Sequence, residues 1–273
     1  MRITEIWPLW NKSAVNFVYI CMMNKTFNSV PRFVAMALAL VMAVPANAVF
    51  ATSPMPPTYV VETRHGVQSY ENPSYTLDLF WPEMVANAAN ADKANAFNSL
   101  VMSVIRPEID GIIEIAKESE GLDMPSGVVS GLWMSYTLFM QTNDIASVRL
   151  EFSPYAKGAA HPNHYSRSIN FDMNTGKEMT LADVFKPKIN PLRMMSAYAT
   201  ANLKARDLLL FPEGALPTPE NYRVWNLSPK GIVMTFDHYQ VMPYAAGMQE
   251  VTMPYRAVKT YLWPNSALAK LAK

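Results

Sequence analysis

Apolar and polar residues alternate along several short stretches of this chain, which is the pattern of half-buried β-strands. The first stretch covers residues 75–81, and Pro82 is expected to end it. Two longer stretches, residues 130–141 and 145–153, are separated by the turn-forming residues 142–144 and predict a β-hairpin. We therefore expect three strands in this part of the chain.

The second arm of the hairpin also predicts how it lies in a sheet. The side chains of Val148 and Leu150 point to one face, whereas those of Arg149 and Glu151 point to the other. One face should therefore be buried and one solvent-exposed, as in an antiparallel sheet that carries helices on a single side.

Apolar residues at three- and four-residue intervals predict helix between residues 91 and 119. Within residues 91–105 the expected buried positions are Phe97, Leu100, Val101 and Val104. Pro107 is tolerated better at the start of a helix than in its interior. Residues 108–119 therefore form either a second helix or a kinked continuation of the first, burying Ile109, Ile112, Ile113 and Ala116.

The second half of the chain repeats this arrangement. A strand at residues 166–171 leads into a tight turn at residues 172–177, in which Gly176 occupies the position that needs a positive φ. The return strand is short, at residues 178–179. The later predicted elements are a helix after Pro191 that buries Met194, Tyr198, Ala201 and Leu208, a hairpin of residues 222–227 and 232–236, a strand at residues 249–253, and a helix at residues 257–263.

A short helical turn is expected directly after the return strand. Thr180 precedes it and Asp183 lies three residues further on. The Thr180 hydroxyl and the Asp183 carboxylate can satisfy free N–H groups at the start of the turn, which predicts a capping arrangement.

These elements predict an α+β protein of two subdomains, each an antiparallel sheet with helices packed on one face. Residues 52–57 are rich in proline, so order should begin near Tyr59. The expected organisation is a linker at residues 49–58, an N-terminal subdomain at residues 59–160, a C-terminal subdomain at residues 161–264, and a tail at residues 265–273.

The segment before the linker has the three parts of a secretory signal. Lys25 and Arg32 are basic, residues 33–44 are apolar, and residues 46–48 read Ala-Asn-Ala. An apolar run of about a dozen residues is short for a membrane span, which needs roughly 20. We expect a signal peptide at residues 23–48, cleaved after Ala48 or alternatively after Ala51, and hence a periplasmic or secreted protein with no membrane span. Residues 1–22 are then expected to be a mis-called extension ahead of Met23.

The cysteine count argues against a disulfide bond, and the charge argues against a nucleic-acid partner. Cys21 is the only cysteine, so the expected mature chain cannot form a disulfide. The whole chain has a net charge of +1. The four basic residues and one acidic residue before position 49 leave 19 basic and 21 acidic residues after it, a net charge of −2. With no basic stripe, we expect no nucleic-acid partner.

Two histidines are the weak candidates for a metal site. His161 and His164 lie three residues apart and could share an ion with Asp172, or with Asp237 and His238. Pro162 breaks any helix between them, however, and no third ligand has a recognisable spacing. The alternative is a loop in which His161 bonds to the backbone and His164 is solvated. We expect no metal and no cofactor.

Catalytic constellations are also weak. No Gly-x-Ser-x-Gly motif marks a nucleophile, and the glycines are dispersed singly rather than gathered in a phosphate-binding loop. The carboxylate pairs Glu118 with Glu120 and Asp237 with Glu250 are interpreted as solvated surface groups. The chain is therefore expected to bind rather than to catalyse.

Two short segments concentrate turn-forming and aromatic residues, residues 159–163 and 243–247. Rings at a sheet edge are common in protein and glycan recognition, and equally common as a cover over a core. The candidate binding residues are Tyr244, Tyr239, His161, Asn163 and Tyr165. For Tyr244 the two interpretations stay open, whereas Trp225 is expected to pack. We expect the first segment to join the two sheets and the second to connect two late strands.

Several motifs together resemble one known family. They are His161-Pro162-Asn163, residues 170–172, residues 175–178, residues 180–185, residues 239–247 and residues 251–255. This set is similar to the extracytoplasmic domain pair of the anti-sigma-V factor RsiV and to the accessory region of PdaC-type peptidoglycan deacetylases. The resemblance covers residues 60–262, with nearly all specific motifs after Pro162. It implies a cell-envelope module. In the anti-sigma factor the domain pair binds lysozyme, and in the deacetylase it accompanies a separate catalytic domain.

The sequence thus predicts an exported, non-catalytic module that binds a cell-wall component, such as peptidoglycan, or a lysozyme-like muramidase. Two alternatives remain: a metal-dependent periplasmic hydrolase of cell-wall glycan centred on His161 and His164, and a purely structural envelope protein. Oligomeric state stays open.

Overall fold

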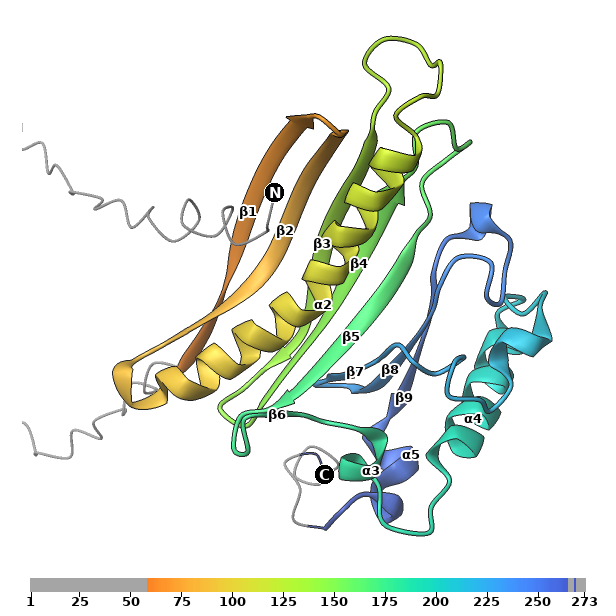
Figure 1. Ribbon diagram of the computed structural model, residues 1–273. Coiled ribbons are helices and arrows are strands. Elements are labelled where there is room, and N and C mark those ends of the chain that lie inside the picture. The colour runs from red at the N-terminus through yellow and green to blue at the C-terminus, as the bar shows by residue number, and fades with distance from the viewer. Residues whose placement is uncertain (1–57, 265–267, 269–273) are drawn as a thin grey trace, which may run out of the picture. The chain divides into compact units, whose positions relative to one another are not determined.

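The computed structural model describes residues 58–264 and residue 268, which form two β-sheets with helices packed against them (Figure 1). One sheet has six strands in the order β1-β2-β3-β4-β5-β6, and the other has three in the order β7-β8-β9. The predicted α+β fold with two sheet subdomains is confirmed. The expected extension, signal peptide and tail lie outside the described residues, as does nearly all of the linker.

The larger sheet is built from β1 Tyr59–Glu71, β2 Ser74–Ala86, β3 Ser130–Gln141, β4 Ile145–Tyr155, β5 Tyr165–Asp172 and β6 Lys177–Glu178. Its pairs are antiparallel except β2 with β3, which is parallel. The long helix α2 (Ala91–Glu118) lies between these two strands in the chain and provides the crossover that a parallel pair requires. The sheet is therefore mixed rather than wholly antiparallel.

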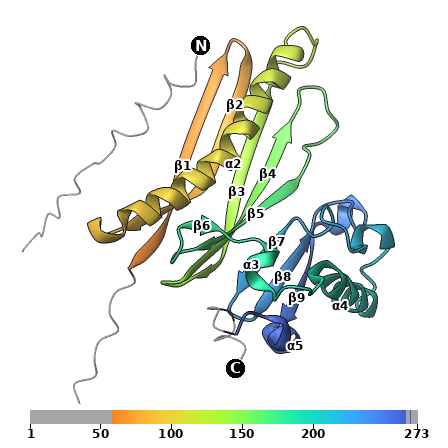
Figure 2. The same ribbon diagram turned by 60° about the horizontal axis from the view of Figure 1, so that its bottom comes forward.

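The smaller sheet consists of β7 Trp225–Ser228, β8 Gly231–Phe236 and β9 Gln249–Pro254, all antiparallel. Its helices are α3 Leu181–Val184, α4 Pro191–Ala205 and α5 Tyr255–Val258. Four short 3-10 turns complete the described part: η2 Ala88–Asn90, η3 Pro212–Ala215, η4 Tyr244–Ala246 and η5 Lys259–Tyr261. Figure 2 shows α2 along one face of the larger sheet and α4 beside the smaller one. No helix of the described residues is long and apolar enough to cross a membrane.

The division between the sheets does not coincide with the expected subdomain boundary at residues 160/161. Both β5 and β6 follow that point, yet β5 pairs with β4 along eight residue positions. Ile169 and Phe171 of β5 are buried in the core beneath α2. The chain therefore leaves the larger sheet only after residue 178.

Two strands extend beyond the sequence prediction. The 13 residues of β1 were not expected as a strand, because side chains on both of its faces are largely exposed and leave no apolar alternation. Strand β2 was expected to end at Pro82 but continues to Ala86. Proline fits there because β3 pairs only with residues 75–79 of β2, so Pro82 has a neighbouring strand on one side alone.

Helix α2 is continuous through Pro107, so the alternative of a second, separate helix is wrong. The predicted Phe97, Val101, Ile112 and Ala116 are buried against the sheet, whereas Leu100, Val104, Ile109 and Ile113 flank them at partly buried positions. In α4 the helix is confirmed but its buried face is shifted. The residues buried there are Met195, Ser196, Ala199 and Leu203, while Ala201 is exposed.

The turn chemistry between β5 and α3 follows the prediction. Gly176 has a φ of 70°, and the backbone amide and the hydroxyl of Thr180 both donate to Asp183 Oδ2 at 2.7 Å. Because the Asp183 carboxylate accepts these hydrogen bonds, its pKa lies below the ordinary value.

The expected solvent-exposed face of β4 is wrong in its first half. Ser147 and Arg149 are buried, with 0% and 5% of their surface exposed, because β7 and its neighbours pack over them. Glu151 and Ser153, nearer the end of the strand, remain partly exposed. This covered polar face holds the two sheets together.

Candidate functional site

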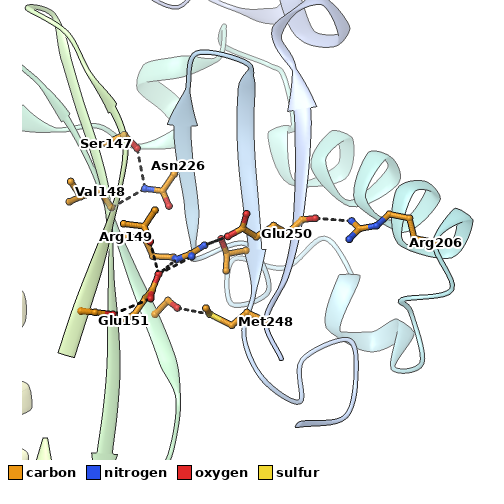
Figure 3. Close-up of polar contacts among 12 residues, drawn as sticks. Ser147, Val148, Arg149, Glu151, Arg206, Asn226, Met248 and Glu250 are labelled. Atoms are coloured by element: carbon orange, nitrogen blue, oxygen red, sulfur yellow. Dashed lines mark hydrogen bonds and ion pairs between the residues drawn. The ribbon is translucent and has the colours of Figure 1, made fainter. Parts of the chain in front are cut away.

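A buried arginine joins the two sheets (Figure 3). Arg149 on β4 donates from Nε and Nη2 to Glu151 Oε1, at 3.0 and 2.8 Å. Its Nη1 reaches across to the smaller sheet and donates to Thr235 Oγ1 at 2.8 Å and to Glu250 Oε1 at 2.5 Å. Planar guanidinium groups are suited to this multiple donation. Arg149 therefore ties β4 to both β8 and β9.

Next to this arginine, a second set of hydrogen bonds joins β4 to β7. Asn226 donates to Ser147 Oγ at 3.0 Å and to the Val148 carbonyl at 2.8 Å. Asn170 on β5 donates to the Trp225 carbonyl at 2.8 Å. We call this set, together with Arg149 and its partners, the polar seam. It fixes the larger sheet relative to the smaller one.

Five aromatic and imidazole rings meet beyond one end of the polar seam. His161 and His164 come from the β4–β5 loop, whereas His238, Tyr239 and Tyr244 come from the β8–β9 connection. Tyr244 is central: its ring centroid lies 4.7 Å from that of His161, 4.9 Å from His238, 5.4 Å from Tyr239 and 5.8 Å from His164. We call these five residues the ring cluster. The two segments singled out by sequence are thus brought together.

His164 is held by the sheet next to it. It directly precedes Tyr165, which pairs with Phe152 at the end of the β4–β5 register, and its Nδ1 is hydrogen-bonded to the hydroxyl of Ser153 at 2.6 Å. Its ring lies 5.1 Å from that of His238. Partial burial lowers the pKa of His164 below 6.5, and the neighbouring His238 and His161 lower it further. The ring cluster therefore favours a neutral imidazole at this position.

Tyr239 is held in an unusual conformation by a tight turn. Its φ is 64°, in the left-handed region that bulky residues rarely adopt, and 59% of its surface is exposed. The Gln240 side chain fixes the turn: its oxygen accepts from the Asp237 amide at 3.1 Å, and its nitrogen donates to the carbonyls of Gly214 and Asn221 at 3.0 and 2.9 Å. The turn thus presents a strained, exposed tyrosine.

Asp237, at the base of the same turn, is almost fully buried. Its Oδ2 accepts from Arg223 and, at 3.2 Å, from the Ser166 amide. Its Oδ1 and the neighbouring His238 Nδ1 are buried polar atoms without a hydrogen-bond partner in the described part of the chain. Asp237 thus anchors the turn to both Arg223 and β5.

The structure separates the five candidate binding residues into two groups. His161, Tyr239 and Tyr244 belong to the ring cluster, and Asn163 is exposed on the same loop as His161, with its amide donating to Pro154 at 2.9 Å. Tyr165 lies on the opposite face of the sheet, where it donates to Glu108 of α2 and stacks on Phe152 at 5.6 Å. Tyr165 is therefore not part of this site. Burial raises its pKa, and the hydrogen bond to Glu108 raises it further.

Two expectations for the histidine loop need correction. His161 Nδ1 does donate to a backbone carbonyl, that of Pro162 at 2.8 Å, but His164 is packed and hydrogen-bonded rather than solvated. The loop also connects β4 to β5 within the larger sheet and does not join the two sheets. Instead it packs against the β8–β9 connection of the smaller sheet, through the contact of His161 with Tyr244.

The alternative metal and carboxylate centres lack a geometric basis. Within residues 58–264, no group of three or more His, Cys, Asp or Glu side chains is placed to hold a metal ion. Asp172 is engaged in its own turn, accepting from Asn174 and Thr175. Asp237 and Glu250 are each paired with a different arginine, Arg223 and Arg149. The interpretation as a solvated surface group is wrong for Asp237, which is buried.

Sequence reasoning missed the contribution of Ser153, and of Trp133 beside it. Trp133 is paired with Ser153 across β3 and β4 and is 53% exposed. It stands between the buried Leu132 and Met134. A large aromatic residue at an outward position of an alternating strand is the signal that could have identified it. Trp225, in contrast, is 7% exposed and packs in the core, as expected.

Fold and site together define a two-sheet α+β protein in which loops from both sheets build one cluster of rings. Comparisons with known proteins place it further. Residues 182–256 match a family model described as a protein of unknown function (DUF3298). The peptidoglycan-N-acetylmuramic acid deacetylase PdaC of Bacillus subtilis is 28% identical over 122 residues, covering 42% of this chain. The match covers 26% of the deacetylase, so the chain corresponds to about a quarter of that relative.

Two solved structures share the fold. Crystal structures of DUF3298 family proteins from Bacteroides fragilis and Pseudomonas aeruginosa superpose with TM-scores of 0.58 and 0.53, each at 14% identity. They cover 78% and 77% of this chain and 96% of their own chains. The expected relationship to PdaC is confirmed as a distant one, whereas the resemblance to the anti-sigma-V factor stays a prediction.

Proposed function

We propose that this chain is an exported, non-catalytic binding module of the cell envelope, which recognises a cell-wall component or a lysozyme-like muramidase. The observation that carries the proposal is the ring cluster, in which five rings from two different sheets meet around Tyr244. Amphipathic rings of this kind supply contact area and polar groups at once, which suits recognition.

The energetic cost of the site supports recognition over simple packing. Tyr239 gains little from burial, since 59% of it is exposed, yet its backbone is held in a disfavoured region. Strained residues of this kind persist where the surrounding structure fixes them, and they gather at functional sites. The turn around Gln240 is such a structure.

The cellular location in the proposal has two supports. The sequence before residue 49 has the three parts of a secretory signal. The distant relative from Bacillus subtilis is named as an enzyme of peptidoglycan. A module exported to the periplasm or beyond would meet cell-wall glycan and muramidases there.

A pull-down tests the proposal directly. The purified chain from residue 49 onward is incubated with insoluble peptidoglycan and, separately, with immobilised lysozyme. We expect retention by one of the two, and weaker retention of a Tyr244→Ala variant. If the folded protein is retained by neither, the proposed function is wrong.

A further inference from the structure

The ring cluster continues into a row of side chains that crosses the larger sheet. Val67 on β1 is paired with Asp78 on β2, Asp78 with Trp133 on β3, and Trp133 with Ser153 on β4. Ser153 is in turn hydrogen-bonded to His164 of the ring cluster. Directly paired residues lie on the same face of a sheet. These side chains therefore form one line that runs across the strands into the ring cluster.

This row lies on the face opposite helix α2. The residues next to it along the strands, Leu77, Leu79, Leu132 and Met134, are buried in the core with α2. The row is open to solvent at Val67, which is 62% exposed, and at Trp133, which is 53% exposed. Tyr239 of the ring cluster, beyond the end of the row, is 59% exposed. Single exposed apolar residues are ordinary on a protein surface, but Val67 and Trp133 lie in one row that leads to the exposed Tyr239, so the three can form one contact surface.

The dimensions of the row suit an extended ligand. Strands in a sheet lie about 4.8 Å apart, so the four strands from β1 to β4 span about 14 Å before the ring cluster begins. A ligand lying across the strands from β1 would pass over Trp133 on β3 before it reaches the tyrosines Tyr244 and Tyr239.

The chemistry of the row suits a ligand that has both apolar faces and hydrogen-bonding groups. Asp78, the carboxylate of the row, is paired with His65 at 2.8 Å, and that imidazole is stacked on Phe80 at 3.8 Å. The cluster favours a neutral His164. Along the row the apolar side chains of Val67 and Trp133 therefore alternate with the Asp78 carboxylate and the Ser153 hydroxyl, and His164 follows at its end. Sugar rings have a matching pattern, with apolar C–H faces and hydrogen-bonding groups around the rim.

We propose that this row binds a chain of N-acetylated hexosamines, laid across strands β1 to β4 and ending on the tyrosines of the ring cluster. Trp133 and Tyr239 stack on sugar rings, while Ser153 and the imidazoles bond to hydroxyl and amide groups. The inference rests on the proposed function and names its ligand as glycan rather than protein. The name of the Bacillus subtilis relative, an enzyme acting on an N-acetylated cell-wall sugar, is consistent with that ligand class.

Calorimetric titration of the purified chain with soluble N-acetylglucosamine oligomers of four to six units tests the inference. We expect saturable binding that weakens about tenfold or more in Trp133→Ala and in Tyr239→Gly, the loss expected for one stacked ring. Trp133→Phe should recover part of it. Tyr261→Ala is the matched control, because Tyr261 is 41% exposed on η5, outside the row. Oligomers of de-N-acetylated glucosamine, which are cationic, should bind more weakly.

The outcomes separate this inference from the proposed function. Retention on peptidoglycan without binding of the oligomers, or retention by lysozyme alone, overturns the glycan row and leaves the binding module standing. Oligomer binding that is unchanged in both row variants, or equal binding of the de-N-acetylated oligomers, also overturns it. Absence of binding to peptidoglycan, lysozyme and oligomers overturns both.

Discussion

At the scale of single residues, Tyr239 combines strain with exposure, and that combination can be tested by its effect on stability. The left-handed region disfavours a residue with a Cβ by roughly 1–2 kcal/mol, and glycine avoids this cost. The contact with Tyr244, at 5.4 Å between ring centroids, offsets only part of this free-energy cost, because Tyr239 is mostly solvated. We therefore expect Tyr239 to contribute to ligand binding while it lowers the stability of the folded protein.

Replacing Tyr239 with glycine should stabilise the protein. We expect Tyr239→Gly to raise the free energy of unfolding by about 0.5–1 kcal/mol, less than the full strain because glycine also adds freedom to the unfolded chain. Urea denaturation measures it. Tyr261→Gly is the matched control and should be destabilising, since Tyr261 lies in the 3-10 turn η5 and has no positive φ to relieve. Equal losses in both variants would contradict the interpretation of strain.

His164 should make stability depend on pH below 6.5. Its pKa in the folded protein is lowered from 6.5, first by burial and then by His238 and His161. Between the lowered value and 6.5 the unfolded chain binds more protons than the folded one, so stability falls as the pH falls through that interval. The melting temperature measured from pH 8 to pH 5 should show this decline, and His164→Gln should reduce it.

Another group with a lowered pKa does not interfere with that measurement. The Asp183 carboxylate is held below its ordinary value of 3.8 by the hydrogen bonds from Thr180. Its stabilising effect is present above that value and is lost only as the pH falls further. An undiminished decline in His164→Gln between pH 6.5 and pH 5 would assign the effect to other groups.

At the scale of elements, the sequence predicted those whose pattern is local. The hairpin of β3 and β4, the turn at Gly176 and the cap at Thr180 depend on neighbouring residues and are confirmed. Strand β1 was missed because it is held by pairing with β2 along its whole length rather than by a buried face of its own. The end of β2 was wrongly placed at Pro82, because the point at which β3 stops pairing with β2 depends on tertiary structure and cannot be read from neighbouring residues.

The turn that presents Tyr239 depends on close contact with η3. Gly214 approaches the turn so closely that a Cβ added to it would lie 1.8 Å from the Gln240 carbonyl oxygen. We expect Gly214→Ala to destabilise the protein by about 1–3 kcal/mol through this overpacking, and to displace Tyr239. Denaturation measures the first effect and NMR shifts of the Tyr239 ring the second.

Gly111 provides the matched control for this substitution. It lies in the interior of α2, and an added Cβ there would have nothing within 4 Å. Gly111→Ala should therefore stabilise the protein by about 0.5–1 kcal/mol, as expected for a solvated helix position. Should Gly214→Ala be as well tolerated as Gly111→Ala, the close contact at η3 does not constrain the turn.

At the scale of the whole molecule, the candidate site exists only because two sheets are packed together. The sequence identified the loops of His161 and Tyr244, but it could not show that they touch, because they are more than 80 residues apart and meet through tertiary packing. It also placed Arg149 on a solvent-exposed face, since alternation alone cannot reveal that a second sheet covers a polar face. The arrangement of the ring cluster therefore depends on the polar seam that holds the sheets together as well as on its own five residues.

This dependence predicts that the polar seam controls both stability and binding. Arg149→Ala leaves Glu151 and Glu250 without their common partner. Removing one member of a fully buried ion pair costs roughly 3–5 kcal/mol, but Glu250 is 45% exposed and can be hydrated, so we expect about 2–3 kcal/mol. Because the seam also aligns the two loops, retention on the ligand identified by pull-down should weaken as well.

A core variant away from the polar seam separates the effect on stability from the effect on binding. Ile112→Val in α2 should cost about 0.5–1.5 kcal/mol without touching the seam, and a protein that stays folded should then bind as before. Binding is measured well below the urea concentration that unfolds either variant, so that the folded fraction is the same in both. Weaker binding in Arg149→Ala alone assigns the alignment of the loops to the seam, because only that variant changes how the sheets are joined. Unchanged binding in both would mean that the ring cluster keeps its arrangement without the arginine, and that Asn226 and Asn170 suffice to hold the loops together.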